Sequence, residues 1–310
     1  MKYAFVFPGQ GSQAIGMGKD FYENFGVAKE MFETASDVLG LDFKKLLFEE
    51  NDLLNQTQYT QPAIFLVSQI AHTILQQESP LLAHFALGHS LGEISALCVA
   101  LGVGFEDGLR LTKARGEMMT KACEGKDAGM MVIVGLSDEV AEEATSSWRN
   151  QGKSVWCANY NGDGQIVLAG KKSDLASIEE PIKALGAKRA LLLPMSVASH
   201  CPLLESMCEP FEELLRKYLK PKFALPIISN ATTKPYDTAE QAYELLRLQL
   251  TSPVLYKQSI LAVDEHIDAY IELGHNGVLK GLNKRLSQKP TLTIANTQTL
   301  QESISQLEQQ

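Results

Sequence analysis

The segment Leu87-Gly88-His89-Ser90-Leu91-Gly92-Glu93 decides the predicted fold, because it sets a serine between two glycines at a change of secondary structure. A short apolar run, 85–87, predicts a buried strand before it, and the nearly all-apolar residues 91–101 predict a buried helix after it. In this context G-x-S-x-G is typical of a nucleophile elbow, which presents the serine hydroxyl at a helix N-terminus. The same residues also fit a capping box, S-x-x-E, which needs no chemistry.

Strands and helices alternate on both sides of this segment. The pattern predicts a first strand at 3–7 and, in the C-terminal part, strands at 226–229, 269–273 and 291–295, each preceded by a helix, at 205–219, 240–250 and 278–286 respectively. This alternation predicts an α/β fold with a parallel-sheet, hydrolase-like core. We assign residues 1–126 and 196–310 to that core and expect 301–310 to be loosely tied.

The middle of the chain, residues 127–195, has a different order of predicted strands and helices. It predicts a strand at 130–134, a helix at 138–150, strands at 154–158 and 166–169, a helix at 175–185 and a last strand at 190–193. The order βαββαβ is the ferredoxin-like pattern, so we expect an inserted subdomain.

A serine nucleophile needs a base, and the chain has six histidines. Two of them follow predicted strands in loops, which is where catalytic groups tend to lie: His200, in Ser196-Val197-Ala198-Ser199-His200-Cys201, and His275, in Gly274-His275-Asn276-Gly277. Spacing alone does not separate these two candidates.

Helical phase singles out two polar side chains. If residues 106–122 form a helix, a charged stripe faces solvent and Arg115 lies on the opposite, apolar face. A buried guanidinium needs an anion, which is either an internal acid or a carboxylate ligand. Gln249 lies on the apolar side of the helix 240–250, where a satisfied buried amide is the simpler interpretation.

The turn Phe7-Pro8-Gly9-Gln10-Gly11-Ser12-Gln13 follows the first strand. It fits a loose dinucleotide fingerprint, but the required acid at the end of a second strand is missing, and no P-loop glycine spacing is present. We interpret it as a turn whose backbone N–H groups face the carboxyl edge of the sheet, where they could form an oxyanion hole with the N–H of Leu91.

Composition excludes some functions. The 310 residues carry a net charge of -9, which disfavours a general role in nucleic-acid binding. No apolar run is long enough to span a membrane or act as a signal peptide. Five cysteines without metal-binding spacing predict reduced thiols in a cytoplasmic protein, with no metal and no cofactor.

Four motifs occur in a specific order: Phe-Pro-Gly-Gln-Gly-Ser-Gln at 7–13, Gly-His-Ser-Leu-Gly-Glu at 88–93, Arg-Gly at 115–116 and Ser-Val-Ala-Ser-His-Cys at 196–201. With them, nearly the whole chain resembles the malonyl-CoA:acyl-carrier-protein transacylases of bacterial fatty-acid synthesis. The resemblance implies transfer of malonyl from coenzyme A to the phosphopantetheine thiol of acyl carrier protein, by way of a malonyl-serine.

The resemblance also implies residue roles. Ser90 would be the nucleophile, His200 the base and Arg115 the clamp on the malonyl carboxylate. The backbone N–H groups of Gln10 and Leu91 would form the oxyanion hole. Gln249 matches a glutamine beside the catalytic histidine, and a nearby backbone carbonyl, rather than an acid, would orient the imidazole.

Three positions depart from the family pattern. Thr120 stands where Gln is frequent, Asp163 replaces a proline in the 159–165 turn, and Gly274-His275-Asn276-Gly277 replaces Gly-Pro-Gly. The last two affect the expected loop shape and partner contacts, but not the chemistry.

The expected partners are malonyl-CoA and acyl carrier protein, with no nucleic acid and no membrane, and the protein is expected to be a monomer. Because carrier proteins are acidic, docking should use a local basic patch. Candidates are Lys171, Lys172, Lys188, Arg189, Lys280, Lys284 and Arg285. The alternatives are a serine hydrolase or thioesterase, which would finish the acyl-enzyme with water, and a non-catalytic scaffold that binds carrier protein.

Overall fold

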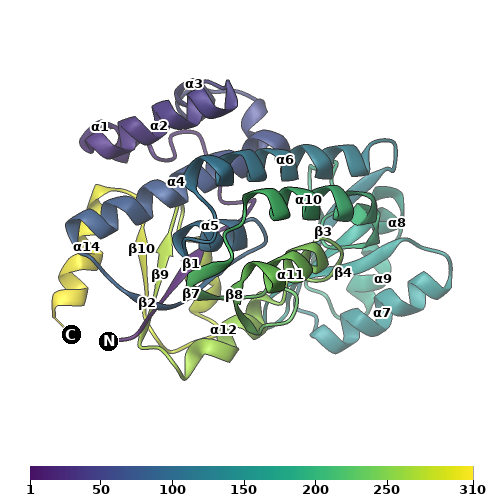
Figure 1. Cartoon of the computed structure of the whole chain (residues 1–310). Coiled ribbons are helices and arrows are strands. Elements are labelled where there is room, and N and C mark those ends of the chain that lie inside the picture. Colours follow the sequence, from purple (N-terminus) through teal and green to yellow (C-terminus); the bar gives the residue numbers. More distant parts are fainter. Residues whose placement is uncertain (310) are drawn as a thin grey trace.

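The computed structural model describes residues 1–309 and contains two β-sheets that lie side by side among helices (Figure 1). In the large sheet, neighbouring strands are parallel, except that the edge strand β8 is antiparallel to β7. The strands of the large sheet, in spatial order, are β10 (Thr291–Ile294), β9 (Ala269–Leu273), β1 (Tyr3–Phe7), β2 (Ala83–Gly88), β7 (Lys222–Ile228) and β8 (Pro235–Thr238). The predicted α/β class is therefore confirmed.

Both faces of the large sheet are covered, which explains why all five residues of β1 are buried. Phe5 and Phe7 face a core shared with helices α4 (Thr57–Glu78) and α5 (Gly92–Val99). Val6, on the opposite face, belongs to a second core that includes residues of α12 (Tyr256–Asp264) and α13 (Val278–Asn283). Because alternate strand residues point to opposite faces, one apolar run serves both cores.

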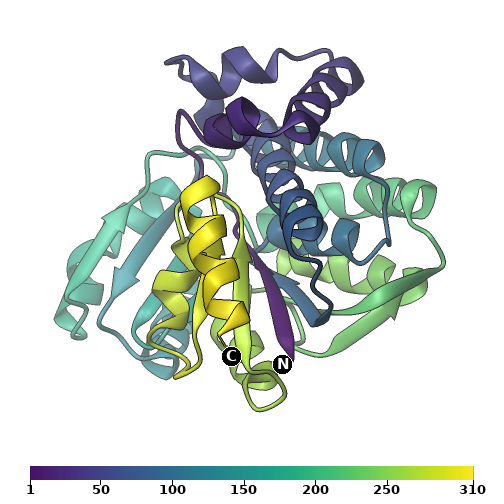
Figure 2. The same ribbon diagram turned by 90° about the vertical axis from the view of Figure 1, so that its left-hand side faces the viewer.

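Further helices surround this core. Both α2 (Gly26–Leu39) and α6 (Phe105–Cys123) pack against α4. Figure 2 shows the first helices at the top of the molecule and the C-terminal helix beside the large sheet. The remaining elements of the core are α1 (Lys19–Asn24), α3 (Phe43–Phe48), the 3-10 helices η1 (Leu53–Asn55) and η2 (Pro202–Met207), α10 (Cys208–Tyr218), α11 (Ala239–Thr251) and α14 (Thr297–Glu308).

The small sheet is antiparallel and is built from the middle of the chain. In spatial order its strands are β4 (Val155–Gly162), β5 (Gln165–Lys171), β3 (Ala128–Val134) and β6 (Arg189–Leu192). This is the strand order expected for the predicted βαββαβ pattern. One face packs under α7 (Asp138–Asn150), α8 (Lys172–Ser177) and α9 (Glu179–Ala184), and the other face turns toward the core.

Two expectations were wrong in detail. The helix predicted at 175–185 is two short helices, α8 and α9, with Ile178 at the junction. Residues 301–308, expected to be loosely tied, belong to α14, whose Asn296 forms a capping box and whose Leu300 and Ser303 are buried. The missed signal is the Asn-x-x-Thr cap before an amphipathic turn. Residue 310 lies outside the described residues.

Candidate active site

Ser90 lies in a tight turn between β2 and α5, at the carboxyl edge of the large sheet. Its φ of 54° is unusual for a residue other than glycine, and such backbone is typical of functional sites. At Gly92 a Cβ atom would lie 2.0 Å from the carbonyl oxygen of Phe7, so only glycine lets the turn approach β1. The capping-box interpretation is wrong, because α5 starts at Gly92 without a side-chain cap.

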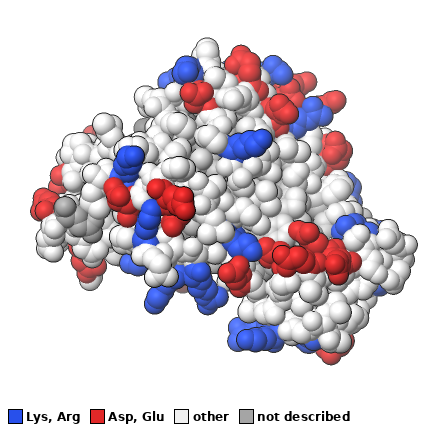
Figure 3. Space-filling view, turned by 90° about the horizontal axis from the view of Figure 1, so that it is seen from below, with Lys and Arg blue, Asp and Glu red and all other residues white. Residues whose placement is uncertain are grey.

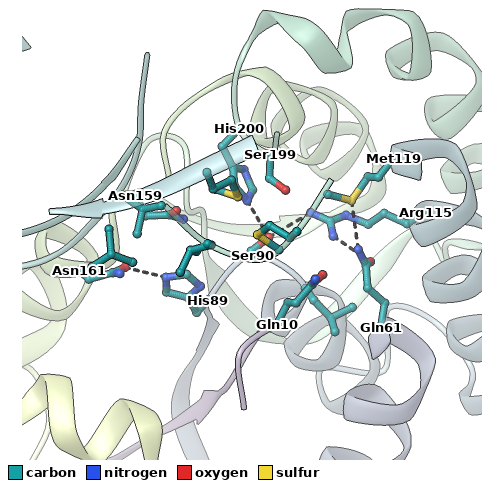
Figure 4. A pocket seen from close by; sticks show the side chains of 16 residues that line it. Gln10, Gln61, His89, Ser90, Arg115, Met119, Asn159, Asn161, Ser199 and His200 are labelled. Atoms are coloured by element: carbon teal, nitrogen blue, oxygen red, sulfur yellow. Dashed lines mark hydrogen bonds between the residues drawn. The ribbon is translucent and has the colours of Figure 1, made fainter. Parts of the chain in front are cut away.

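The Ser90 hydroxyl meets two buried side chains that come from different elements (Figure 4). The Nε2 atom of His200 lies 2.7 Å from Ser90 Oγ, and Arg115 Nη2 donates to the same oxygen at 3.2 Å. Both side chains are almost fully buried, at 2% and 1% exposure. His200 comes from the segment between the small sheet and η2, and Arg115 comes from the apolar face of α6.

Gln249, near the end of α11, contacts all three of these residues. Its backbone carbonyl lies 2.7 Å from His200 Nδ1, so the imidazole is held between a carbonyl and the serine hydroxyl. Its side-chain Oε1 accepts from Arg115 Nη2 at 2.9 Å, and its Nε2 donates to the Ser90 carbonyl at 3.1 Å. The two hydrogen-bond partners of the imidazole are therefore a hydroxyl and a backbone carbonyl, and neither is a carboxylate.

A cavity of about 210 Å³ opens in front of Ser90, between the two sheets. The core side of its wall carries Gln10, Leu91 and Gln61 besides the residues already described. Within residues 1–309, neither the Gln10 nor the Leu91 backbone N–H donates to a protein acceptor. Two backbone donors therefore stay available beside the serine. The small sheet contributes a largely apolar wall, which includes Met130, Val132, Asn159, Asn161 and Val167.

Burial controls the protonation of the charged groups. Desolvation lowers the pKa of His200 to about 3, assisted by the positive charge of Arg115 and opposed by the Gln249 carbonyl. The imidazole is therefore neutral near pH 7, as a general base requires. Burial also lowers the pKa of Arg115 to about 10, which leaves it charged at neutral pH.

Arg115 forms no ion pair within the described chain, so the interpretation of an internal acid as its direct partner is wrong. Its Nη1 donates to Gln61 Oε1 at 2.9 Å, and its buried Nε has no hydrogen-bond partner. A buried donor without an acceptor is costly, and the cavity that Arg115 lines gives a ligand oxygen access to this residue.

Ser90, His200, Arg115 and Gln249 are thus brought together, with Gln10 and Leu91 on the same cavity. His275 follows β9 and is not among the residues that line it. His89 points away from Ser90 and its Nε2 lies 2.7 Å from Asn161 Oδ1 (Figure 4).

Sequence reasoning missed two residues of the site, Gln61 and Asn230. Gln61 is a buried amide in a stretch of α4, residues 60–71, that is buried on all sides, so the helical-phase argument used for Arg115 does not single it out. Asn230 follows the end of β7; its Oδ1 accepts from the Ser90 N–H at 2.7 Å and its Nδ2 donates to the Gly88 carbonyl at 2.6 Å. A polar residue at the end of a parallel strand is the signal there.

Among residues 1–309, no cluster of three or more His, Cys, Asp or Glu side chains is placed to hold a metal ion. In the same range, no helix combines the length and apolar character needed to cross a bilayer.

Comparison with known proteins finds a family described as "Acyl transferase domain" over residues 4–304. A curated relative, the malonyl CoA-acyl carrier protein transacylase of Bacillus subtilis, is 35% identical over 312 residues, covering 100% of this chain and 98% of the relative. The crystal structure of the malonyl-CoA:acyl carrier protein transacylase from Helicobacter pylori matches with a TM-score of 0.96 at 52% identity, covering 99% of both chains. One chain of a structure described as a "type II PKS acyl-carrier protein in complex with its malonyl-transacylase" matches with a TM-score of 0.94 at 34% identity, covering 100% of both chains.

Proposed function

The chain belongs to the acyl transferase domain family, and from that premise we propose that it transfers malonyl groups from malonyl-CoA to the phosphopantetheine thiol of acyl carrier protein. The observation that carries the malonyl assignment is Arg115: a buried guanidinium on the cavity wall, hydrogen-bonded to two amides, with no carboxylate partner among residues 1–309. The free carboxylate of a malonyl group supplies the missing anion.

The first half-reaction loads the serine. His200 Nε2 takes the proton of the Ser90 hydroxyl as Oγ forms a bond to the thioester carbon. The backbone N–H groups of Gln10 and Leu91 stabilise the oxyanion. When the carbon–sulfur bond breaks, His200 returns the proton to the departing thiolate, which leaves coenzyme A as a thiol and malonyl-Ser90 as an ester.

The second half-reaction reverses these roles. His200 takes the proton of the carrier's thiol as its sulfur attacks the ester carbon, and the Ser90 oxygen leaves and recovers that proton. The Gln249 carbonyl keeps Nδ1 protonated throughout, so Nε2 is the nitrogen that exchanges protons. No metal or cofactor takes part in this sequence.

The carrier protein is acidic, so it should dock on basic side chains near the cavity mouth. The seven candidate lysines and arginines form no ion pair within the part of the chain that the structure describes, and all except Lys172 are well exposed. Figure 3 shows small groups of basic side chains separated by acidic ones on one face, rather than one continuous basic surface. We also expect a cytoplasmic monomer that binds neither nucleic acid nor membrane.

Intact-mass measurement after incubation with malonyl-CoA tests the proposal. The wild-type protein should gain the mass of one malonyl group and lose it when a carrier protein with a phosphopantetheine thiol is added. Ser90→Ala should gain nothing. Absence of the adduct in the wild type, or its persistence in Ser90→Ala, would contradict the proposal.

A serine hydrolase acting on acyl thioesters is the alternative, because water could also attack the acyl-enzyme. Free malonate released at the same rate with and without carrier protein would favour this alternative. The inward Arg115 counts against a hydrolase of neutral acyl groups, which has no use for it, and the matched acyl transferase family favours transfer over hydrolysis.

A further inference from the structure

Glu93 is a carboxylate buried behind the catalytic turn, at 0% exposure, and it does not line the cavity. Its Oε1 accepts from the Tyr236 hydroxyl at 2.8 Å. Its Oε2 accepts from the Asn230 backbone N–H at 3.0 Å and from Gln249 Nε2 at 2.8 Å. The carboxylate therefore touches residues that touch the reacting serine, but not the serine hydroxyl or the cavity.

The contact with Gln249 fixes the orientation of that amide. An ionised carboxylate only accepts hydrogen bonds, and a guanidinium only donates them. Gln249 lies between the two, with its Nε2 toward Glu93 and its Oε1 toward Arg115. If the amide were reversed, two donors would face each other at Arg115 and two acceptors would face each other at Glu93. Glu93 thus determines that an acceptor meets Arg115.

The same carboxylate supports the backbone of Ser90. Gln249 Nε2 donates to the Ser90 carbonyl, and Asn230 Oδ1 accepts from the Ser90 N–H. Both of these residues are held by Glu93 Oε2. The left-handed φ of 54° at Ser90 is unfavourable by itself, so contacts of this kind are needed to keep the hydroxyl in place.

Glu93 also balances the charge of Arg115 without pairing with it directly. The bridging amide keeps the two charges apart, so a ligand carboxylate does not have to displace an internal acid from the guanidinium. Burial raises the pKa of Glu93 to about 7, and the hydrogen bonds that Glu93 accepts and the charge of Arg115 oppose this rise. At pH 8 the carboxylate form therefore predominates.

We propose that Glu93 is a positioning residue for acyl selectivity: through the Gln249 amide it holds Arg115 ready for a ligand carboxylate, and through Gln249 and Asn230 it holds the Ser90 backbone. This inference rests on the proposed malonyl transfer. It assigns to Glu93 an effect on malonyl transfer that exceeds its effect on transfer of a neutral acyl group.

The test compares kcat/KM for malonyl-CoA and acetyl-CoA at pH 8 in Glu93→Gln. Malonyl transfer should fall about 10-fold or more, because a glutamine amide can offer Gln249 either an acceptor or a donor and so no longer fixes which Gln249 atom meets Arg115, whereas acetyl transfer should fall much less. Tyr236→Phe is the matched control, since it removes a buried hydrogen bond from the Glu93 oxygen that does not contact Gln249. Its malonyl preference should equal that of the wild type.

Gln249→Met gives a second route if Glu93→Gln folds poorly, because it removes the bridging amide but keeps the backbone carbonyl that holds His200. It should lose malonyl preference to a similar extent, and the double variant should be no worse than the more affected single variant. Equal losses for the two acyl groups, or additive losses in the double variant, would overturn the inference. A wild-type protein that forms no malonyl adduct would instead overturn the proposed function.

Discussion

The two sheets contribute to the cavity in different ways. The large parallel sheet contributes the ends of its strands: Gln10 follows β1, Ser90 follows β2 and Asn230 follows β7. The small antiparallel sheet contributes a face, where Val132 of β3 lies opposite Val167 of β5. Parallel strands all end at one edge, so their loops bring backbone donors and polar groups together there. An antiparallel sheet instead presents rows of side chains, which form a wall.

This comparison separates the residues that carry the proposed chemistry from those that shape the cavity wall. The buried polar network of Ser90, His200, Arg115 and Gln249 is made by segments of the core and by the segment that returns to it from β6. Changes in the network should alter rate or selectivity strongly. Changes in the apolar wall should alter stability more than chemistry.

The largest expected effect is that of removing the proposed base. His200→Ala should lower the rate of malonyl transfer about 1,000-fold, which is within the range for loss of a general base. The measurement is the initial rate with malonyl-CoA and carrier protein. His275→Ala is the matched control, because His275 is also a loop histidine after a strand but does not line the cavity. Comparable losses in both variants would contradict the assignment.

The next effect concerns selectivity. Arg115→Ala should reduce the preference for malonyl-CoA over acetyl-CoA by about 30- to 1,000-fold, since the charged hydrogen bond to the malonyl carboxylate is worth roughly 2–4 kcal/mol. The ratio of the two kcat/KM values measures this directly. Arg110→Ala, on the exposed face of the same helix, should keep the wild-type ratio. An unchanged ratio in Arg115→Ala would refute the proposed clamp.

A third effect follows from the pKa of His200, which burial lowers to about 3. A base works when deprotonated, so a lowered pKa extends its range toward acid. Phosphonylation of Ser90 by a fluorophosphonate, in which Oγ attacks phosphorus and displaces fluoride, should therefore keep most of its rate at pH 5, where a histidine of pKa 6.5 would be only about 3% neutral. Glu93→Gln, measured alongside, removes the other titrating group of the network. A half-maximal rate near pH 6.5 in both proteins would contradict the prediction.

Most of the fold was predictable because its signals are local. The strand before Ser90, the apolar helix after it and the βαββαβ order of residues 127–195 each follow from short-range hydrophobic pattern. The prediction of a single helix at 175–185 also rested on a local pattern. It failed because α8 ends and α9 begins at Ile178, and composition does not reveal this break. The pairing of β4 with the core through Val254 joins distant segments, and no periodicity could indicate it.

The residues of the candidate site were predictable from the sequence only in part. Arg115 was found because its phase on α6 conflicts with its charge, which is a physical signal within one helix. The preference for His200 over His275 came from family resemblance, because both follow strands and only the assembled fold brings one of them near Ser90. The position of Asn230 after a strand could have marked it as a site residue, but its partner Ser90 and the partners of Glu93 lie about 140 positions away, so no sequence pattern could indicate these contacts.

The smallest expected effect on activity comes from the apolar wall, where neighbouring residues of β3 face opposite sides. Val132 lines the cavity, whereas Ile133 is fully buried under the helices of the small sheet. Val132→Ala should change malonyl kcat/KM by no more than about threefold, because the removed methyl groups carry neither a charge nor a hydrogen-bonding atom. Ile133→Ala should lower unfolding free energy by about 2–5 kcal/mol, with the malonyl-to-acetyl preference unchanged in whatever fraction stays folded. Chemical denaturation and kcat/KM ratios measure the two quantities separately. If Val132→Ala altered the acyl preference as strongly as Arg115→Ala, the small sheet would carry specificity, and the division between a chemical core and a passive wall would be wrong.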